Sequence, residues 1–284
     1  MKLAYFPNQC ALNARPVITA FLNSCRGHNI TTVENSMTAD AAVIWSLLWH
    51  GRMAPNQAVY DAYRRQNRPV FVIETGALVR NQTWKIAVNN ITADGHYGHT
   101  ENLDWDRPRQ LGITLQNTVP ANPGILIAAQ HQRSHTVADL PSQEHWVTQM
   151  VTQIRAQTDR PVYVRPHPRS RLNPDLLPST VQYLTPRRVF NTYDSYDIDY
   201  SYQAVINYNS SVGIQSALQG TNAVVDATSL AYPVSIALGD LEKPYRVDRE
   251  QWLVEIAHTE YTVDEIEQGT WFPRLKKYAF EQQH

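Results

Sequence analysis

The amino-acid sequence predicts an α/β protein of two lobes, each built on a mainly parallel sheet. Short apolar runs alternate with helical patterns over residues 1–75, and the same alternation starts again at Gly124. Between these parts, residues 93–123 are rich in Gly, Pro, Asn, Asp and His, which is typical of loops. Alternation of strands and helices is the pattern of open α/β sheets. We therefore expect one lobe over residues 1–120 and a second over residues 121–284, with a helix at its C-terminal end.

The first lobe contains predicted strands at residues 2–6, 29–33, 41–49 and 69–74. The run at 41–49 is apolar almost throughout, as in parallel strands that are buried on both faces. Helices are predicted at 16–23 and 57–65, and Val59, Tyr60 and Tyr63 lie on one side of the second. This order predicts an open sheet with helices packed on it.

The second lobe repeats the pattern, with predicted strands at residues 124–129, 161–165, 181–184, 204–208 and 223–226. Ser142 is a predicted N-cap for a helix that runs to about residue 157, and Gly220 is a predicted stop for a helix over 212–219. A further helix is expected over residues 249–268. Because ligands of such folds bind where strands end and helices begin, we expect a site facing a cleft between the lobes.

The composition indicates a globular protein without a general affinity for nucleic acid. The 284 residues are 43% hydrophobic and 18% charged, and the formal net charge is -1. The N-terminus lacks a signal-peptide pattern, and the longest apolar run is too short to span a bilayer. We expect a cytoplasmic protein that does not bind membranes, with Cys10 and Cys25 reduced.

The strongest candidate site lies at Asn209, Ser210 and Ser211, between a predicted strand and a predicted helix. Backbone N–H groups at a helix start are free, and the helix dipole adds partial positive charge there. Two serine hydroxyls add donors that fit phosphate oxygens, so the motif predicts an anion site. The alternative is an ordinary helix cap, because Ser is among the commonest N-cap residues.

A second candidate site is Arg165-Pro166-His167-Pro168-Arg169, directly after a predicted strand. The prolines restrict the backbone around the histidine. Neighbouring positive charges disfavour protonation of His167, which suits it to donate a hydrogen bond to a phosphate or ribose. The alternative is an exposed histidine in a rigid turn.

A third candidate site is Glu74, which ends the predicted strand 69–74 and is followed by Thr75 and Gly76. A carboxylate placed there can act as a general base, and Arg80 can pair with it or with a substrate. The alternative is a solvated glutamate at a turn. We expect no metal, because the spacing of the histidines matches no zinc pattern; these are His96, His99, His131, His135 and His145.

Together these motifs resemble those of bacterial capsule polysaccharide glycosyltransferases, which include Kdo transferases and, more distantly, polysialyltransferases. The resemblance rests on Glu74-Thr75-Gly76 with Arg80, Asp94 to Tyr97, Gln130, Arg165 to Pro168, and Asn209 to Gly213 with Gly220. Thr75 stands where relatives carry an acid. The C-terminal segment, with Trp252-Leu253 and Gly269, resembles phage-encoded transferases that are thought to modify hydroxymethylated pyrimidines in DNA.

The resemblance implies a GT-B-like fold, with two Rossmann-like lobes and a ligand cleft between them. It implies a metal-independent glycosyltransferase without a cofactor, which uses a nucleotide sugar, a UDP-sugar being favoured over a CMP-sugar. Glu74 would be the catalytic carboxylate. The residues expected to bind the donor are Gln130, Arg165, His167, Asn209, Ser210 and Ser211. The residues expected to bind the acceptor or support the site are Arg80, Trp49 and Tyr97.

For the acceptor, the resemblance implies a 5-hydroxymethyl-pyrimidine in phage DNA, in which case the protein works in the host cytoplasm. DNA would need a local basic patch, for which the candidates are Arg107, Arg109, Arg165, Arg169, Arg171, Arg187 and Arg188. Trp49, Trp84, Tyr97 and Trp105 would stack on a base or a sugar, unless they belong to the core. Two alternatives stay open: a transferase acting on a capsule or lipopolysaccharide glycan, and a non-catalytic protein that binds nucleotide sugars.

Overall fold

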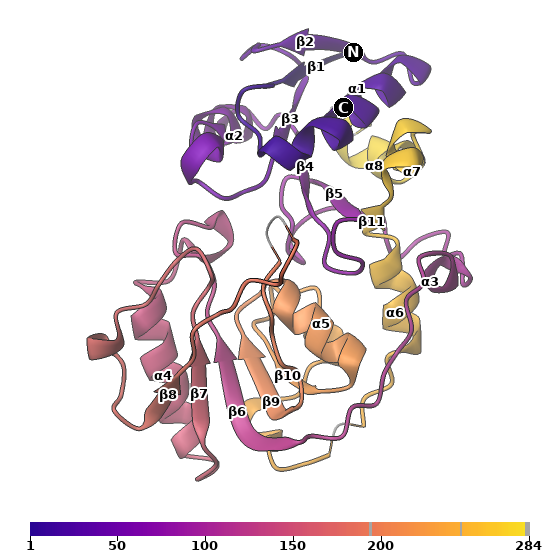
Figure 1. Ribbon diagram of the computed structural model, residues 1–284. Coiled ribbons are helices and arrows are strands. Elements are labelled where there is room, and N and C mark those ends of the chain that lie inside the picture. The colour runs from indigo at the N-terminus through magenta and orange to yellow at the C-terminus, as the bar shows by residue number, and fades with distance from the viewer. Residues whose placement is uncertain (193–194, 245, 282–284) are drawn as a thin grey trace. The chain divides into compact units, whose positions relative to one another are not determined.

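The chain forms two compact units, each with its own sheet. The computed structural model describes residues 1–192, 195–244 and 246–281 (Figure 1). The first unit comprises Met1–Ile113 together with the chain from Leu253 onward, and the second comprises Thr114–Trp252. The predicted boundary at residue 120 lies close to the observed one. The expectation that the C-terminal part belongs to the second lobe is wrong, because that part packs into the core of the first unit.

The sheet of the first unit has the order β11-β5-β4-β3-β1-β2. Its strands are β1 (Lys2–Tyr5), β2 (Thr31–Glu34), β3 (Ala41–Trp45), β4 (Val70–Thr75), β5 (Trp84–Val88) and β11 (Glu260–Tyr261). The four strands β1 to β4 pair in parallel, whereas β5 runs antiparallel to β4 and β11 antiparallel to β5. β3 ends earlier than the apolar run predicted, because Ser46 takes a positive φ of 66° and turns the chain.

Helices cover both faces of this sheet. The covering helices are α1 (Arg15–Gly27), α2 (Asn56–Arg65), α7 (Val263–Glu267) and α8 (Phe272–Ala279). The unit also contains α3 (Arg107–Gln110) and the end of α6 (Glu250–Ala257), which begins in the second unit. Phe21 of α1, Ile266 of α7 and Leu275 of α8 are fully buried in one core with Phe71 of β4. The opposite face packs against α2 through residues such as Tyr63. No helix in the described parts of the chain is long and apolar enough to cross a membrane.

The second unit contains an entirely parallel sheet with the order β10-β9-β6-β7-β8. Its strands are β6 (Asn122–Ala128), β7 (Val162–Arg165), β8 (Val181–Tyr183), β9 (Tyr202–Asn207) and β10 (Asn222–Val224). The predicted cap of α4 (Gln143–Arg155) is confirmed, since Ser142 Oγ accepts from the His145 N–H at 3.0 Å. The predicted stop of α5 (Ser211–Gln219) is confirmed too, since Gly220 is left-handed with φ 78°. All carboxyl ends of these strands therefore lie at one edge.

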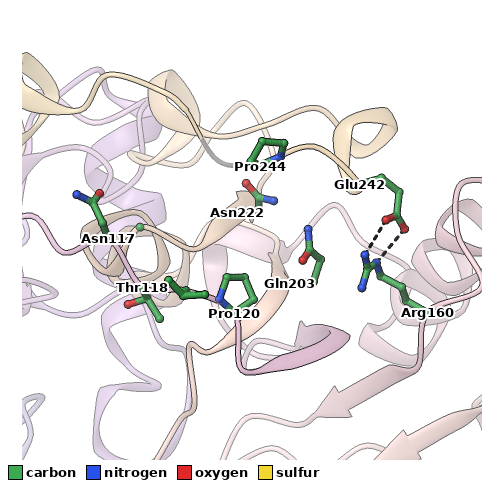
Figure 2. A pocket seen from close by; sticks show the side chains of 10 residues that line it. Asn117, Thr118, Pro120, Arg160, Gln203, Asn222, Glu242 and Pro244 are labelled. Carbon is green, nitrogen blue, oxygen red and sulfur yellow. Dashed lines mark hydrogen bonds and ion pairs between the residues drawn. The ribbon is translucent and has the colours of Figure 1, made fainter.

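A shallow hollow of about 460 Å³ lies in the second unit, at the amino ends of β9 and β10 (Figure 2). Gln203 and Asn222, near the starts of these strands, contribute to its lining. An ion pair between Arg160 Nη2 and Glu242 Oε2, 2.7 Å apart, also borders it. Because ligands of parallel sheets bind at the carboxyl edge, this hollow is separate from the candidate site.

The C-terminal segment is not the single helix that was predicted over residues 249–268. α6 ends at Ala257, and Glu260 and Tyr261 then pair with Lys85 and Trp84 as strand β11. Thr262 caps a new helix, α7: its hydroxyl accepts from the Glu265 N–H, and the Glu265 carboxylate accepts from the Thr262 N–H. The helical periodicity of the sequence continues across this interruption and therefore does not show it.

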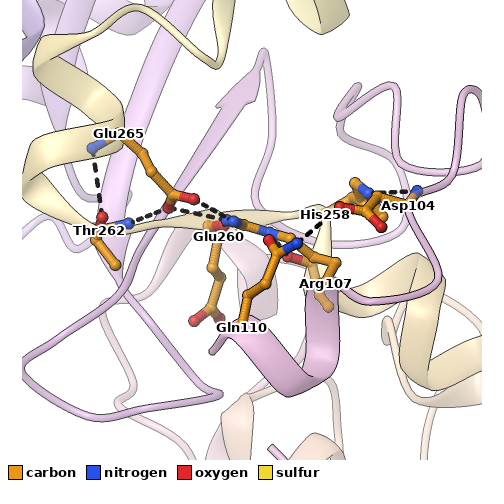
Figure 3. A network of polar contacts seen from close by, with 8 residues as sticks. Asp104, Arg107, Gln110, His258, Glu260, Thr262 and Glu265 are labelled. Atoms are coloured by element: carbon orange, nitrogen blue, oxygen red, sulfur yellow. Dashed lines mark hydrogen bonds and ion pairs between the residues drawn. The ribbon is translucent and has the colours of Figure 1, made fainter. Parts of the chain in front are cut away.

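Arg107 links helix α3 to the C-terminal segment of the chain (Figure 3). The guanidinium donates to both carboxylate oxygens of Glu265, to the Glu260 carbonyl at 2.8 Å and to the Ala257 carbonyl at 3.3 Å. Only 6% of Arg107 is exposed. Its expected place in a DNA-binding patch is therefore wrong, because the guanidinium is buried and all of these hydrogen bonds are made within the protein.

His258 makes a second link in the same network (Figure 3). Its Nε2 accepts from the Asp104 N–H at 3.2 Å, and its Nδ1 lies 2.7 Å from the Val254 carbonyl. These two contacts fit a neutral ring that carries its proton on Nδ1. Burial lowers the pKa of His258, and the nearby Arg274 and Arg107 lower it further.

Candidate functional site

Gln130 and Asn209 meet at the carboxyl edge of the second sheet. They follow the neighbouring strands β6 and β9, which pair with Ala128 opposite Asn207. The side chain of Gln130 donates to Asn209 Oδ1 at 3.0 Å and accepts from the Asn209 N–H at 2.6 Å. Gln130 is only 5% exposed. This reciprocal pair fixes the start of the loop that leads into α5.

The side-chain amide of Asn209 is fully used within the protein. Its Nδ2 donates to the Thr136 carbonyl at 3.0 Å and to Thr228 Oγ1 at 2.9 Å. Thr228 in turn donates to Asp226 Oδ1 at 2.7 Å, beyond β10. Asn209 therefore joins three loops at the sheet edge. Both hydrogens of its side-chain amide are used within the protein, so its predicted role in binding the nucleotide sugar would be to hold these loops in place.

Ser210 is the N-cap of α5, so the simpler of the two interpretations holds for its hydroxyl. Its Oγ accepts from the Val212 N–H at 3.4 Å and donates to Asn207 Oδ1 at 3.0 Å. The Ser210 N–H also donates to Asn207 Oδ1, at 2.8 Å. Asn207 is buried and donates to the Ala128 carbonyl, which binds the cap to β6. Sequence reasoning missed Asn207, although its place at the end of a strand beside the serines was a signal.

Ser211 differs from Ser210, because its donors remain available. Among the described residues, neither its N–H nor its hydroxyl makes a hydrogen bond, and the residue is half-buried at the first position of α5. The N-terminal end of a helix carries roughly half a positive charge. The anion-binding capacity that the sequence predicted for the serine pair therefore rests on Ser211.

His167 lies beside a second histidine, His131, at the ends of β7 and β6. Their ring centroids are 5.2 Å apart at an angle of 73°. Nδ1 of His167 accepts from the Arg169 N–H, and Nδ1 of His131 accepts from the Arg133 N–H, both at 3.1 Å. A neutral ring with this contact carries its proton on Nε2. Nε2 of His131 is buried within the protein. The sequence motif identified His167 but considered His131 only as a zinc ligand.

Arg165 is placed differently from the other predicted donor-binding residues. Only 9% of it is exposed, and its Nη2 donates to the Asp197 carbonyl at 2.5 Å. Burial lowers the pKa of its guanidinium, and Tyr200 and Asp197 partly offset that effect. Its guanidinium holds the chain near residue 197, and its role toward a donor stays a prediction.

The remaining predicted site residues belong to the first unit. Glu74 is half-buried at the end of β4, and its Oε1 accepts from the Thr75 N–H at 2.8 Å. Arg80 is exposed, and Trp49 packs against Tyr60 with ring centroids 5.7 Å apart. Tyr97 is 1% exposed, so it belongs to the core and stacking on a base or sugar is excluded in this conformation.

The structure shows why a glycine, Gly76, is needed two residues after Glu74. A Cβ on Gly76 would lie 2.3 Å from the Thr83 carbonyl oxygen and 2.4 Å from Glu260 Oε2. The Glu260 carboxylate accepts from the Ala77 N–H at 2.5 Å, the Leu78 N–H at 3.1 Å and Thr83 Oγ1 at 2.6 Å. Glu260 therefore holds the loop that follows Glu74, a role hidden by its predicted place within a helix.

The predicted basic patch is weakened by the contacts of its arginines. Arg188 donates through Nε and Nη2 to the Thr192 carbonyl, and Arg109 pairs with Asp106 at 3.2 Å. Together with the buried Arg107 and Arg165, these contacts engage four of the seven candidates in local structure. Over the residues that the structure describes, these contacts give a DNA-binding patch no support.

Comparisons with known proteins identify the fold. No protein-family model and no curated protein matches the chain. The β-Kdo 2,4 transferase KpsC of Thermosulfurimonas dismutans is similar at 12% identity and a TM-score of 0.56, over 95% of this chain and 98% of that chain. The β-Kdo 2,7 transferase KpsC of the same organism is similar at 11% identity and a TM-score of 0.53, over 94% of this chain and 98% of that chain. The predicted GT-B-like α/β fold is therefore confirmed.

Proposed function

We propose that this chain is a glycosyltransferase that moves a sugar from a nucleotide donor to a hydroxyl acceptor. The observation that carries the proposal is the carboxyl edge of the second sheet, where Ser211 offers free donors at a helix N-terminus. His167, after the neighbouring strand β7, would add a ring N–H donor, and the ring of His131 packs against it. The likeness of the whole chain to two Kdo transferases supports the same reaction class.

The chemistry follows from charge. When the bond between sugar and phosphate breaks, the leaving phosphate gains negative charge, and fixed donors aimed at it lower the barrier. The end of a helix contributes about 0.3–1 kcal/mol per charge, and up to about 2 kcal/mol when partly buried. As the resemblance implies, we place a UDP-sugar ahead of a CMP-sugar. Glu74 would take the acceptor proton.

The donor site is tested by Ser211→Asp. A carboxylate at the first turn of a helix stabilises the helix but repels a phosphate, so binding is separated from folding. We expect unchanged protein to bind UDP more tightly than CMP in isothermal titration calorimetry. Ser211→Asp should weaken UDP binding at least about tenfold while keeping the melting temperature.

Gln57→Asp is the matched control, because it places the same charge in the exposed first turn of α2. It should leave UDP binding unchanged. Failure of the unchanged protein to bind UDP or CMP contradicts the proposal, and so does equal UDP affinity of Ser211→Asp and the unchanged chain.

The acceptor is resolved by transfer assays. The protein is incubated with UDP-glucose or a CMP-sugar and either DNA containing 5-hydroxymethylcytosine or a Kdo-terminated oligosaccharide, and the products are weighed by mass spectrometry. The engaged arginines give the DNA acceptor no support, so the assay decides between DNA and a glycan. A protein that binds UDP but transfers to neither, with Glu74→Ala behaving identically, would be a non-catalytic nucleotide-sugar-binding protein.

A further inference from the structure

Lys85 is a buried cation between two carboxylates. It lies on β5, directly opposite Glu74 on β4 and directly opposite Glu260 on β11. Residues directly opposite in antiparallel strands project from the same face of the sheet. The neighbours Ile73, Ile86 and Tyr261 point into the core on the other face. The three charged side chains therefore form a row across the sheet, in the order Glu74, Lys85 and Glu260.

The two carboxylates of this row differ in how they are satisfied. Glu260 accepts three hydrogen bonds from the loop after Glu74, at 2.5–3.1 Å. Glu74 accepts one, from the neighbouring Thr75 N–H. Glu260 is fully buried, whereas Glu74 is half-buried. Glu74 is thus the carboxylate with fewer hydrogen bonds from the protein.

Lys85 has no close partner of its own. It is 5% exposed, and within the described residues its amine makes neither a hydrogen bond nor an ion pair. Burying a cation without such contacts costs free energy, so its position needs a reason other than stability. Burial lowers the pKa of Lys85, and the charges of Glu260 and Glu74 oppose this effect. Tyr97 is the further titratable group near the row, because its hydroxyl is buried close to both carboxylates.

We propose that Lys85 is a positioning residue for Glu74. Lys85 lies opposite both carboxylates, so its charge links Glu74 to Glu260 and to the loop that Glu260 holds. The inference rests on the glycosyl transfer proposed above. In that reaction the O–H bond of the acceptor breaks and its oxygen bonds to the sugar carbon. The bond from that carbon to the phosphate breaks with its electron pair going to the phosphate, and the proton goes to Glu74. Lys85 stabilises the ionised Glu74 that must be present before this step.

A test of the coupling needs no acceptor. The chain has only five lysines, so ¹³Cε-labelled lysine gives few NMR signals, and Lys85→Met identifies the one of interest. We expect Lys85 to titrate below the ordinary lysine range and its midpoint to fall further in Glu74→Gln, by on the order of one pH unit. Glu267→Gln, an exposed change on α7, should leave the midpoint in place. A Lys85 midpoint that ignores Glu74→Gln overturns the inference.

Kinetics separate positioning from a structural role. Lys85→Met should lower kcat at least about tenfold and move the acid limb of the pH–rate profile upward, with UDP affinity and melting temperature unchanged. Lys85→Arg keeps the charge and should restore the limb. Loss of kcat with an unmoved limb, or a large fall in melting temperature, contradicts positioning. A protein that shows the NMR coupling but binds neither UDP nor CMP would refute the proposed function and leave the Glu74–Lys85 coupling standing.

Discussion

The link between Arg107 and Glu265 makes a quantitative prediction about how the first unit is held together. Arg107→Met removes a guanidinium that donates to the Glu265 carboxylate and to the carbonyls of Ala257 and Glu260. Methionine keeps much of the side-chain volume, so the change acts mainly on charge and hydrogen bonds. The segment expected to loosen is the one from Thr259 through α7, which those contacts bind to α3.

The magnitude follows from the burial of the pair. Removing one partner of a buried ion pair costs about 3–5 kcal/mol. Burial raises the pKa of Glu265, but the hydrogen bonds from Arg107 and Thr262 outweigh burial and leave that pKa below its ordinary value. Because 24% of the Glu265 side chain is exposed, water can replace part of the loss. We therefore expect the low end of the range, about 3 kcal/mol, which is roughly a hundredfold change in a local opening equilibrium.

Native-state hydrogen exchange is the suitable assay, because a chain of two units need not unfold in one step. Amides of β11 and α7 should exchange roughly a hundredfold faster in Arg107→Met, while those of β6 and β9 keep their rates. Arg109→Met, on the same helix, is the control: its side chain is 78% exposed, so water screens its pair with Asp106 and its loss should leave the exchange rates unchanged. Equal exchange in both variants would refute the assignment of Arg107 as the anchor.

Three further predictions concern the first unit. Burial lowers the pKa values of His258 and His99, so both favour the neutral form in the fold; stability is complete above about pH 6.5, where unfolded histidine is neutral, and falls as the pH drops below it. The melting temperature should therefore fall from pH 7.5 to pH 5, and His258→Gln should reduce that fall; an equal fall in both proteins would contradict this cause. Gly76→Ala should destabilise by about 1–3 kcal/mol in urea unfolding, because its Cβ would lie 2.3 Å from a backbone oxygen; a neutral result would show that the loop yields. Tyr97→Phe should leave the melting temperature unchanged or raise it, because among the described residues its buried hydroxyl has no hydrogen-bond partner; a fall of several degrees would reveal one.

The spacing of apolar residues predicted most of the fold, because the central strands and helices bury the apolar side chains that this spacing identifies. The strand over 69–74 and the capped helix α4 formed as expected, since local caps and apolar runs agree with their tertiary contacts. The strand β5 was missed, and its polar Lys85 interrupts the apolar pattern within a run of only five residues. β11 was missed because a strand of two residues is too short to show an alternation of apolar and polar residues. Only its pairing with β5 makes it a strand.

The candidate site divides in the same way. The positions of Gln130, His167 and residues 209–211 at the carboxyl edge of the sheet were predicted, because strand ends and helix starts can be recognised locally. The roles of Asn207 and Glu260 depend on which loops they hold, and these partners lie 79 and 183 residues away in the chain. Long-range contacts of this kind leave no spacing pattern. The adjacent serines also differ in a way that spacing does not show, because Ser210 caps α5 whereas the donors of Ser211 make no hydrogen bond among the described residues.

The return of the C-terminal segment has a consequence for biogenesis. Tyr261, Trp271 and Leu275 complete a core that begins at Leu3, so residues 1–113 expose an unfilled apolar surface until translation has reached α8. The second unit is continuous in sequence and can close on itself earlier, while the ribosome still holds the remainder. Truncation before Leu253 should thus yield an aggregating N-terminal part attached to a folded domain, and residues 114–252 are the natural segment to produce alone.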